Sequence, residues 1–168
     1  MAEKGGADRI MGGKYQEAEL LFLMKKINIH LEIRLEKILK QQNISGTQVY
    51  FLVYILRRHP MGTYITDMYR EIGISKATLS GLVKKMRGKG YLCFQENPGD
   101  TRRKKVVPTR KLMEESKELL QRAQGMETEI FEALDSDEKK QLWNLQQKIL
   151  KKLKETEQKK EVQDESCS

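Results

Sequence analysis

The stretch SKATLSGLVKKMRGKGYLCFQENPGDTRRKKVVPT, residues 75–109, decides the fold of this chain. Ser75 is a residue type favoured at helix N-caps, and apolar residues then recur at helical spacing until Gly88 and Gly90 end the pattern. Two β-prone runs, YLCFQE and KKVVP, lie on either side of the turn NPGD and predict a hairpin. Pro108 cannot donate to a sheet ladder, so we expect the second run to be an edge strand. The stretch predicts a helix followed by a two-stranded β hairpin.

Two shorter helices are predicted before this stretch. TDMYREI fits a short helix that stops near Gly73, and GIS connects it to the helix that Ser75 begins. Ser45 is followed three residues later by Gln48, which is the spacing of a capping box, so an earlier helix should run from about Gly46 to Arg58. Two short helices joined by a tight connection are typical of a helix-turn-helix.

Longer helices flank this module. Apolar residues at helical spacing predict a first helix within about 16–42, and a similar pattern resumes at Thr109 and continues to about Leu134. Asp135 or Ser136 can cap a last helix, which carries Leu142, Leu145, Ile149 and Leu153 on one face. We expect one protomer over residues 16–155, with a flexible glycine-rich tail at 1–15 and a polar, disordered tail at 156–168.

The positive charge of the chain is concentrated in one segment. The formal net charge of the chain is +8. Residues 76–111 alone carry +9, because they contain eleven Lys and Arg residues and only two acidic residues, Glu96 and Asp100. The remainder of the chain therefore sums to −1. A single basic segment in a nearly neutral protein indicates a surface for a polyanion.

The helix that begins after Ser75 has two different sides. At 100° per residue, Leu79, Leu82, Val83 and Met86 share one side, and Ala77, Gly81, Lys84 and Gly88 share the other, with Ser80 and Lys85 flanking. A glycine inside a helix lowers its stability by about 1 kcal/mol relative to alanine. The glycine at Gly81 therefore indicates that another body approaches the helix backbone closely there. The major groove of a DNA duplex is such a body. The alternative is a tolerated surface glycine on a solvated helix face.

These motifs together resemble the MarR family of winged helix-turn-helix regulators. The resemblance rests on ISGTQVYFLVYIL, on SKATLSGLVKKMRGKGYL and on the wing ENPGDTRRKKVVPT, and it spans roughly residues 18–155. The wing signature of an aspartate, an arginine, a lysine, a valine and a threonine is met by Asp100, Arg102, Lys104 in register or Lys105 one place on, Val106 and Thr109. Two positions depart from the family pattern, with Pro108 in place of leucine and Leu112 in place of glycine.

The resemblance implies a mainly α fold with a two-stranded wing. It places the winged helix-turn-helix at about 45–108 and dimerisation helices at about 16–42 and 109–155, so the protein is expected to act as a homodimer. Arg102 would enter the minor groove, oriented by a hydrogen bond from its guanidinium to Asp100, while Arg103, Lys104 and Lys105 would contact phosphates. The expected DNA-binding residues are Ser75, Lys76, Ala77, Thr78, Ser80, Gly81, Lys84, Lys85, Asp100, Arg102, Arg103, Lys104 and Lys105.

Other sites are weakly indicated. Tyr50 and Tyr54, one helical turn apart, lie near the position of the family's effector pocket, and core packing is the alternative for both. Cys93 is expected to be a small buried apolar residue, with no resolving cysteine nearby. His30 and His59 lack metal-ligand spacing, so we predict neither a metal nor a cofactor.

Two functions fit the sequence. The first is a transcriptional regulator, a repressor released by a small ligand, that binds double-stranded DNA. The second is an interaction protein that uses its basic wing on RNA or on an acidic protein. The sequence contains no recognisable catalytic constellation and no apolar run long enough to cross a membrane, so we expect a cytoplasmic protein that is not an enzyme. It leaves open the operator, the effector, the regulated genes and the sign of regulation.

Overall fold

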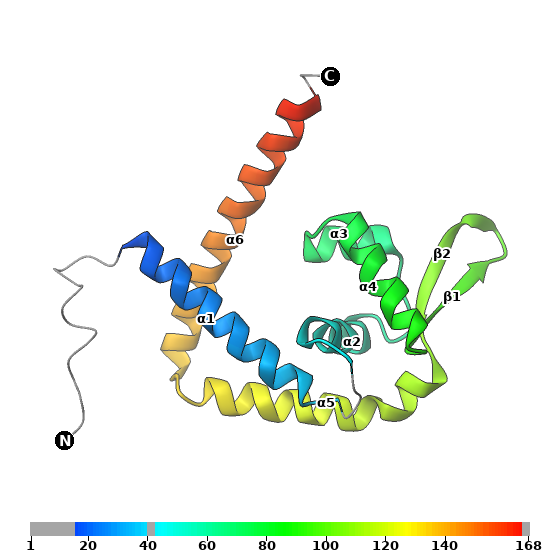
Figure 1. Cartoon of the computed structure of the whole chain (residues 1–168), viewed down its shortest axis with the longest axis horizontal. Coiled ribbons are helices and arrows are strands. Elements are labelled where there is room, and N and C mark those ends of the chain that lie inside the picture. Colours follow the sequence, from blue (N-terminus) through cyan, green and yellow to red (C-terminus); the bar gives the residue numbers. More distant parts are fainter. Residues whose placement is uncertain (1–15, 40–42, 166–168) are drawn as a thin grey trace. The chain divides into compact units, whose positions relative to one another are not determined.

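The computed structural model describes residues 16–39 and 43–165, and within them the chain forms six helices and one two-stranded antiparallel sheet (Figure 1). Their bounds are α1 Glu17–Glu36, α2 Gly46–Arg58, α3 Ile65–Ile72, α4 Lys76–Gly88, β1 Leu92–Asn97, β2 Asp100–Pro108, α5 Arg110–Phe131 and α6 Ser136–Glu165. The chain divides into two compact units, Met1–Tyr50 and Phe51–Ser168, with the boundary inside α2. The tail predicted at 1–15 lies outside the described residues.

The first unit contains α1 and the start of α2. The predicted capping box is present, because the Gln48 amide N–H donates to Ser45 Oγ at 3.2 Å and the Ser45 amide N–H donates to Gln48 Oε1 at 3.3 Å. Glu32 accepts hydrogen bonds from both the amide and the hydroxyl of Thr47, at 2.8 and 2.7 Å. A Cβ on Gly46 would lie 2.5 Å from the Glu32 carbonyl oxygen, so glycine permits this close approach. Helix α1 ends at Glu36, before the predicted boundary at 42.

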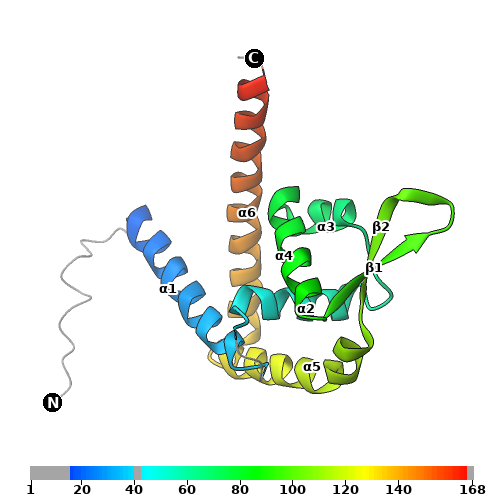
Figure 2. The same ribbon diagram turned by 45° about the vertical axis from the view of Figure 1, so that its right-hand side comes forward.

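The second unit holds the helix-turn-helix. Helix α3 ends at Gly73, whose φ of +77° is the left-handed conformation that glycine adopts without strain. Ser75 then caps α4 as predicted, since its Oγ accepts a hydrogen bond from the Thr78 amide at 3.1 Å. The two helices lie side by side, and the hairpin follows from the end of α4 (Figures 1 and 2). The buried residues of this unit are Phe51, Leu52, Val53, Ile55, Leu56, Thr63, Met68, Leu79, Val83, Met86, Tyr91, Leu92, Val106, Leu112, Leu119 and Ala123.

The second strand of the hairpin is longer than predicted. Asn97 pairs with Asp100, so Pro98 and Gly99 alone form the turn and β2 begins four residues before the predicted start at Lys104. The wing cations therefore lie along a strand, where successive side chains point to opposite faces. Lys104 and Lys105 are paired and point to opposite faces, whereas Arg102 and Arg103 lie where the register shifts and have no paired residue in β1.

The base of the wing is paired on both sides. Thr63 forms an antiparallel bridge with Val106, with backbone N–H to O distances of 2.9 and 2.7 Å, on the edge of β2 away from β1. As predicted, β2 is an edge strand of the two-stranded sheet, and among the described residues Val106 is the one position of its outer edge with a bridge, since its N–H can pair although Pro108 has none. Gly62 precedes the bridge at φ +94°, and a Cβ there would lie 2.4 Å from Val107 Cγ1.

Side-chain caps also fix the two C-terminal helices. Thr109 Oγ1 accepts from the Leu112 amide at 3.3 Å and donates to the Gly90 carbonyl at 2.6 Å, which ties the start of α5 to the segment before β1. Asp135 is the cap of α6, because its Oδ1 accepts from the amides of Asp137 and Glu138 at 2.9 and 2.8 Å. Helix α6 continues to Glu165, beyond the predicted start of the tail at 156, through a segment rich in helix-forming Lys, Glu and Gln. None of the helices in the described ranges is long and apolar enough to cross a membrane.

Candidate nucleic-acid interface

The predicted outer face of α4 is exposed. Leu79, Val83 and Met86 are buried and Leu82 is half-buried, so the helix presents its opposite side outward. The exposed residues are Ala77, Thr78, Ser80, Lys84, Lys85 and Gly88. A Cβ added to Gly81 would meet no atom of the described chain within 4 Å, so no contact inside the chain requires a glycine there. This face is small in its first half and cationic in its second.

The N-terminal end of α4 presents two hydroxyl groups and a cation. Ser75 Oγ and Thr78 Oγ1 lie 2.8 Å apart and share a hydrogen bond, which fixes both hydroxyl groups at the start of the helix. The Lys76 ammonium lies 5.4 Å from the centre of the Tyr69 ring, so its charge is directed toward α3. All three polar side chains predicted at this end of the helix are exposed.

Asp100 fixes the backbone of the wing beside Arg102. Its Oδ1 accepts a hydrogen bond from the Arg102 backbone N–H at 3.0 Å, so the bond from the guanidinium expected from the sequence is not the one that forms. A side chain hydrogen-bonded two residues along its own chain makes a tight local turn, which explains the preference for the backbone donor. The Arg102 side chain is exposed.

Arg103 is turned back onto the module. Its guanidinium lies 4.5 Å from the centre of the Tyr64 ring and donates to Thr66 Oγ1 at 3.3 Å. The predicted phosphate contact would therefore require Arg103 to leave Tyr64. The contact joins residues that lie 39 positions apart and depends on the fold. The only sequence signal for it is the aromatic residue, Tyr64, just before α3.

Arg87 and Phe94 also belong to this candidate interface and were not predicted. The Arg87 guanidinium lies 4.0 Å from the centre of the Phe94 ring, and the Lys104 ammonium lies 5.8 Å from the centre of the same ring. Lys105, the remaining wing cation, is half-buried. The electropositive surface therefore extends from α4 across β1 to β2.

Cys93 is exposed, so the prediction of a small buried apolar residue is wrong. It lies between buried Leu92 and half-buried Phe94 on β1. Because side chains alternate along a strand, Cys93 points to the face opposite that of its two neighbours. A run of four consecutive β-prone residues does not reveal which of them is on the covered face.

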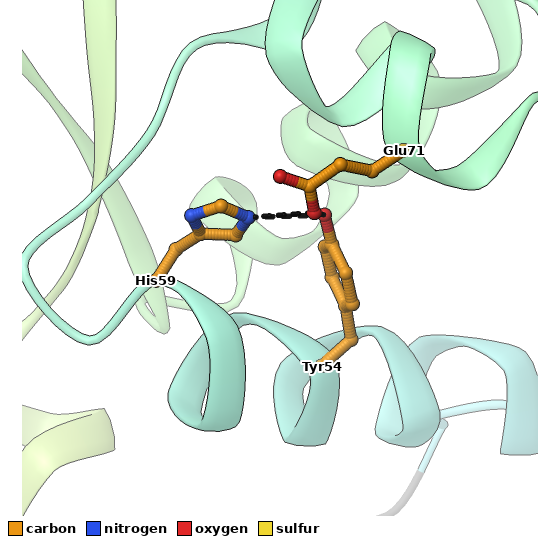
Figure 3. A network of polar contacts seen from close by, with 3 residues as sticks. All are labelled: Tyr54, His59 and Glu71. Carbon is orange, nitrogen blue, oxygen red and sulfur yellow. Dashed lines mark hydrogen bonds and ion pairs between the residues drawn. The ribbon is translucent and has the colours of Figure 1, made fainter.

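A polar network joins the ends of α2 and α3 (Figure 3). The Tyr54 hydroxyl donates to Glu71 Oε2 at 2.6 Å, and His59 Nε2 lies 3.0 Å from the same oxygen and 3.1 Å from the hydroxyl. Burial, and then the bond to Glu71, raise the pKa of Tyr54, whereas the bonds from Tyr54 and His59 lower the pKa of Glu71. Tyr54 thus belongs to a polar clamp, and Tyr50 is exposed, so pure core packing describes neither tyrosine. Within the described ranges no three potential metal-binding side chains are grouped.

The sequence and the fold both match known proteins. Residues 42–103 match the model of the MarR family. None of the curated proteins compared with the chain matches it.

Several solved structures share the fold. The crystal structure of a MepR–DNA complex from S. aureus superposes with a TM-score of 0.69 at 20% identity, over 83% of this chain and 99% of that one. A MarR family regulator from Listeria monocytogenes, complexed with 26mer DNA, gives a TM-score of 0.65 at 15% identity, over 85% and 91%. BpsR from Bordetella bronchiseptica, whose DNA binding is regulated by 6-hydroxynicotinic acid, gives 0.64 at 17% identity, over 82% and 97%. The shared fold is the winged helix.

Proposed function

Because residues 42–103 are a MarR-family segment, we propose that this protein is a transcriptional regulator that binds double-stranded DNA in a sequence-specific manner. The observation that carries the proposal is the exposed face of α4, where Ala77, Ser80 and Gly81 leave room for another body and Lys84 and Lys85 follow with positive charge. A major groove admits such a helix, and its flanking phosphates attract the lysines.

The start of α4 supplies the first contacts in this proposal. Ser75, Lys76 and Thr78 reach phosphates, since hydroxyl groups, amides and ammonium groups at a helix N-terminus all favour an anion. Ser80 faces the base edges one turn further along the helix. The regulator is then positioned by phosphates and reads sequence mainly through this first half of α4.

The wing supplies contacts to the neighbouring minor groove. Arg102 is exposed next to the Pro98–Gly99 turn and enters the groove, where a narrow A·T-rich segment concentrates negative potential. Asp100 holds the backbone at this position. Lys104 and Lys105 contact phosphates, and Arg103 does so only on leaving Tyr64.

We further propose that the regulator is a homodimer on a pseudo-palindromic operator. Large apolar side chains are exposed along two helices, Leu20, Leu21, Phe22, Leu23, Met24, Ile27, Ile29 and Ile33 on α1 and Trp143, Leu145, Ile149, Leu150 and Leu153 on α6. Runs of exposed apolar residues of this size mark protein interaction surfaces. Two-fold symmetry then presents two copies of α4 to half-sites about one helical turn apart.

The proposed sign of regulation is repression, released by a small-molecule effector. The DNA binding of BpsR, which shares the fold, is regulated by 6-hydroxynicotinic acid, a small acid. Tyr50 and Tyr54 are the candidate effector residues. Tyr54 is the more informative of the two, because its hydroxyl already connects α2 to α3 of the helix-turn-helix.

Competition binding tests the proposed function. A duplex of 20 to 30 base pairs from the protein's own promoter should outcompete bulk genomic DNA at physiological salt by about 10³-fold or more, as specific sites do. Equal affinity for both DNAs, together with tighter binding of single-stranded RNA or of an acidic protein, would favour the interaction protein instead. Loss of operator binding on addition of a ligand would identify the effector.

A further inference from the structure

Two cations of the basic module share one aromatic ring. Arg87, in the last turn of α4, lies with its guanidinium carbon 4.0 Å from the centre of the Phe94 ring. The Lys104 ammonium, from β2, lies 5.8 Å from that centre. One side chain of β1 thus brings together charges from the recognition helix and from the wing.

The register of the hairpin explains why they meet. Phe94 pairs with Val106, and Lys104 lies two residues before Val106 on the same strand, so both side chains are on one face of the sheet. Val106 is buried, which orients this face of the wing toward the module. Arg87 reaches the ring from α4, whose end leads directly into β1.

Neither cation is neutralised by an ion pair within residues 16–39 and 43–165. The ion pairs of the described residues do not include Arg87 or Lys104, and Glu96, opposite Lys104 in the sheet, makes no ion pair with it. A ring face attracts a cation through its quadrupole but does not cancel its charge. Two like charges held at one ring repel each other, and an anion bound between them would offset that repulsion.

Arg87 also lies next to the proposed reading face. It follows Lys84 by one helical turn and Ser80 by two turns, on the side of α4 that borders the hairpin. A sugar-phosphate chain separates the major groove, where α4 would lie, from the minor groove, where Arg102 would lie. That chain must pass between α4 and the wing, which is where both cations lie against the Phe94 ring.

We propose that Arg87 and Lys104 together bind a single DNA phosphodiester in each protomer, and that Phe94 positions both cations for it. Phe94 is a positioning residue, since it touches the cations and not the phosphate. The site deepens the proposed function and rests on it, because it requires that α4 and the wing engage one duplex.

Salt dependence of binding to a 24-base-pair duplex of mixed sequence tests the shared site. The variants are Arg87→Gln, Lys104→Gln and the double variant, with Lys111→Gln as control because Lys111 lies 4.3 Å from the ring of Tyr91 elsewhere in the module. For one shared phosphate per protomer, the slope of log affinity against log salt should fall by about 0.9 in the double variant, or about 1.8 for a dimer. Two independent phosphates would double that loss, and a loss no greater than that of the control would remove both residues from the interface.

A second comparison isolates the ring. Phe94→Leu keeps an apolar side chain on the strand and should lower affinity several-fold in the otherwise unchanged protein, but have no effect in the Arg87→Gln, Lys104→Gln background. An equal loss in both backgrounds would show that Phe94 acts only through packing, and would overturn its positioning role. Failure of the unsubstituted protein to bind any duplex would overturn the proposed function itself, whereas binding with an unchanged slope in the double variant overturns the shared site alone.

Discussion

The hydroxyl of Tyr54 lies 2.6 Å from the carboxylate of Glu71 and connects α2 to the last turn of α3. The bond is made to an ionised carboxylate, because the pKa of Glu71 is lowered by Tyr54 and His59. The segment it holds leads through Gly73 to Ser75, where α4 begins. The start of α4 therefore follows a segment held by a carboxylate charge that acid can remove.

This clamp predicts a dependence of stability on pH. Since the pKa of Glu71 is lower in the folded state, its contribution is complete above the unfolded-state pKa and is lost as the pH falls through the folded-state value. Glu71→Gln should cost about 1 kcal/mol or less at pH 7, because the carboxylate is solvent-exposed, and should flatten the stability profile below pH 4.5. Urea unfolding at pH 7 and pH 3.5 measures both effects. A parallel loss with acid in both proteins would contradict the clamp.

Two glycines predict opposite responses to alanine. Gly81→Ala should stabilise the protein by up to about 1 kcal/mol, because the new Cβ meets no atom within 4 Å and alanine favours helix. Gly62→Ala should destabilise it by about 2 kcal/mol or more, because φ is +94° and the Cβ would clash with Val107. Thermal unfolding of both variants measures the difference. Equal stability of the two would contradict the geometry at the base of the wing.

A larger side chain at Gly81 tests the approach of α4 to DNA. Gly81→Glu should keep the fold and abolish specific binding, since it places bulk and negative charge on the face proposed to enter the groove. Gly125→Glu is the matched control, because Gly125 is also a helical glycine with open space around its Cβ, and it lies on α5. Gel-shift titration with the promoter duplex measures both. Retained operator affinity in Gly81→Glu would remove α4 from the interface.

The wing arginine should read flanking sequence. Arg102→Ala should cost about 1–3 kcal/mol per half-site, with preference lost mainly at A·T-rich flanks. Arg110→Ala serves as control, because it removes an exposed arginine that pairs with Glu114 at the start of α5. Affinities for operators with A·T-rich and G·C-rich flanks separate the two. If Arg102→Ala bound both operators as tightly as the unsubstituted protein, the wing would be only a charged hairpin.

The exposed face of α6 predicts self-association. Leu145→Glu with Ile149→Glu should dissociate the proposed homodimer or produce aggregates, because both side chains are exposed on the apolar side of the helix. Asn144→Asp adds a carboxylate on the polar side of the helix, away from all of these apolar residues, and should leave the assembly intact. Sedimentation velocity measures the masses. An unsubstituted protein that sediments as a monomer at micromolar concentration would contradict the dimer proposal.

Features set by neighbours in sequence were predictable. The capping box of Ser45 and Gln48, the cap at Ser75 and the break at Gly73 are fixed by chemistry within three or four residues, and the structure has all of them. The MarR resemblance drew on the same local motifs and is confirmed by the match over residues 42–103.

Features set by strand register and tertiary contact were not predictable. The exposure of Cys93 depends on which face of a β-strand is covered, and a shift of one residue reverses it. The contacts of Arg87 with Phe94 and of Arg103 with Tyr64 join different elements, so composition showed a basic segment but not the aromatic rings that hold it. The early start of β2 depended on a turn of only two residues.

The bridge between Thr63 and Val106 divides the wing into two parts that should differ in backbone flexibility. At the bridge, β2 is paired on both edges, so the Val106 amide, which donates to the Thr63 carbonyl oxygen, should exchange its hydrogen with solvent slowly, as part of a cooperative unit of the core. Between the bridge and the Pro98–Gly99 turn the hairpin is a two-stranded ribbon, which is only marginally stable by itself. Amide hydrogens near the turn should therefore exchange with solvent quickly. The wing is thus a rigid stem with a compliant tip, and if its tip enters a minor groove as proposed, this compliance would let it follow grooves of different width without moving α4.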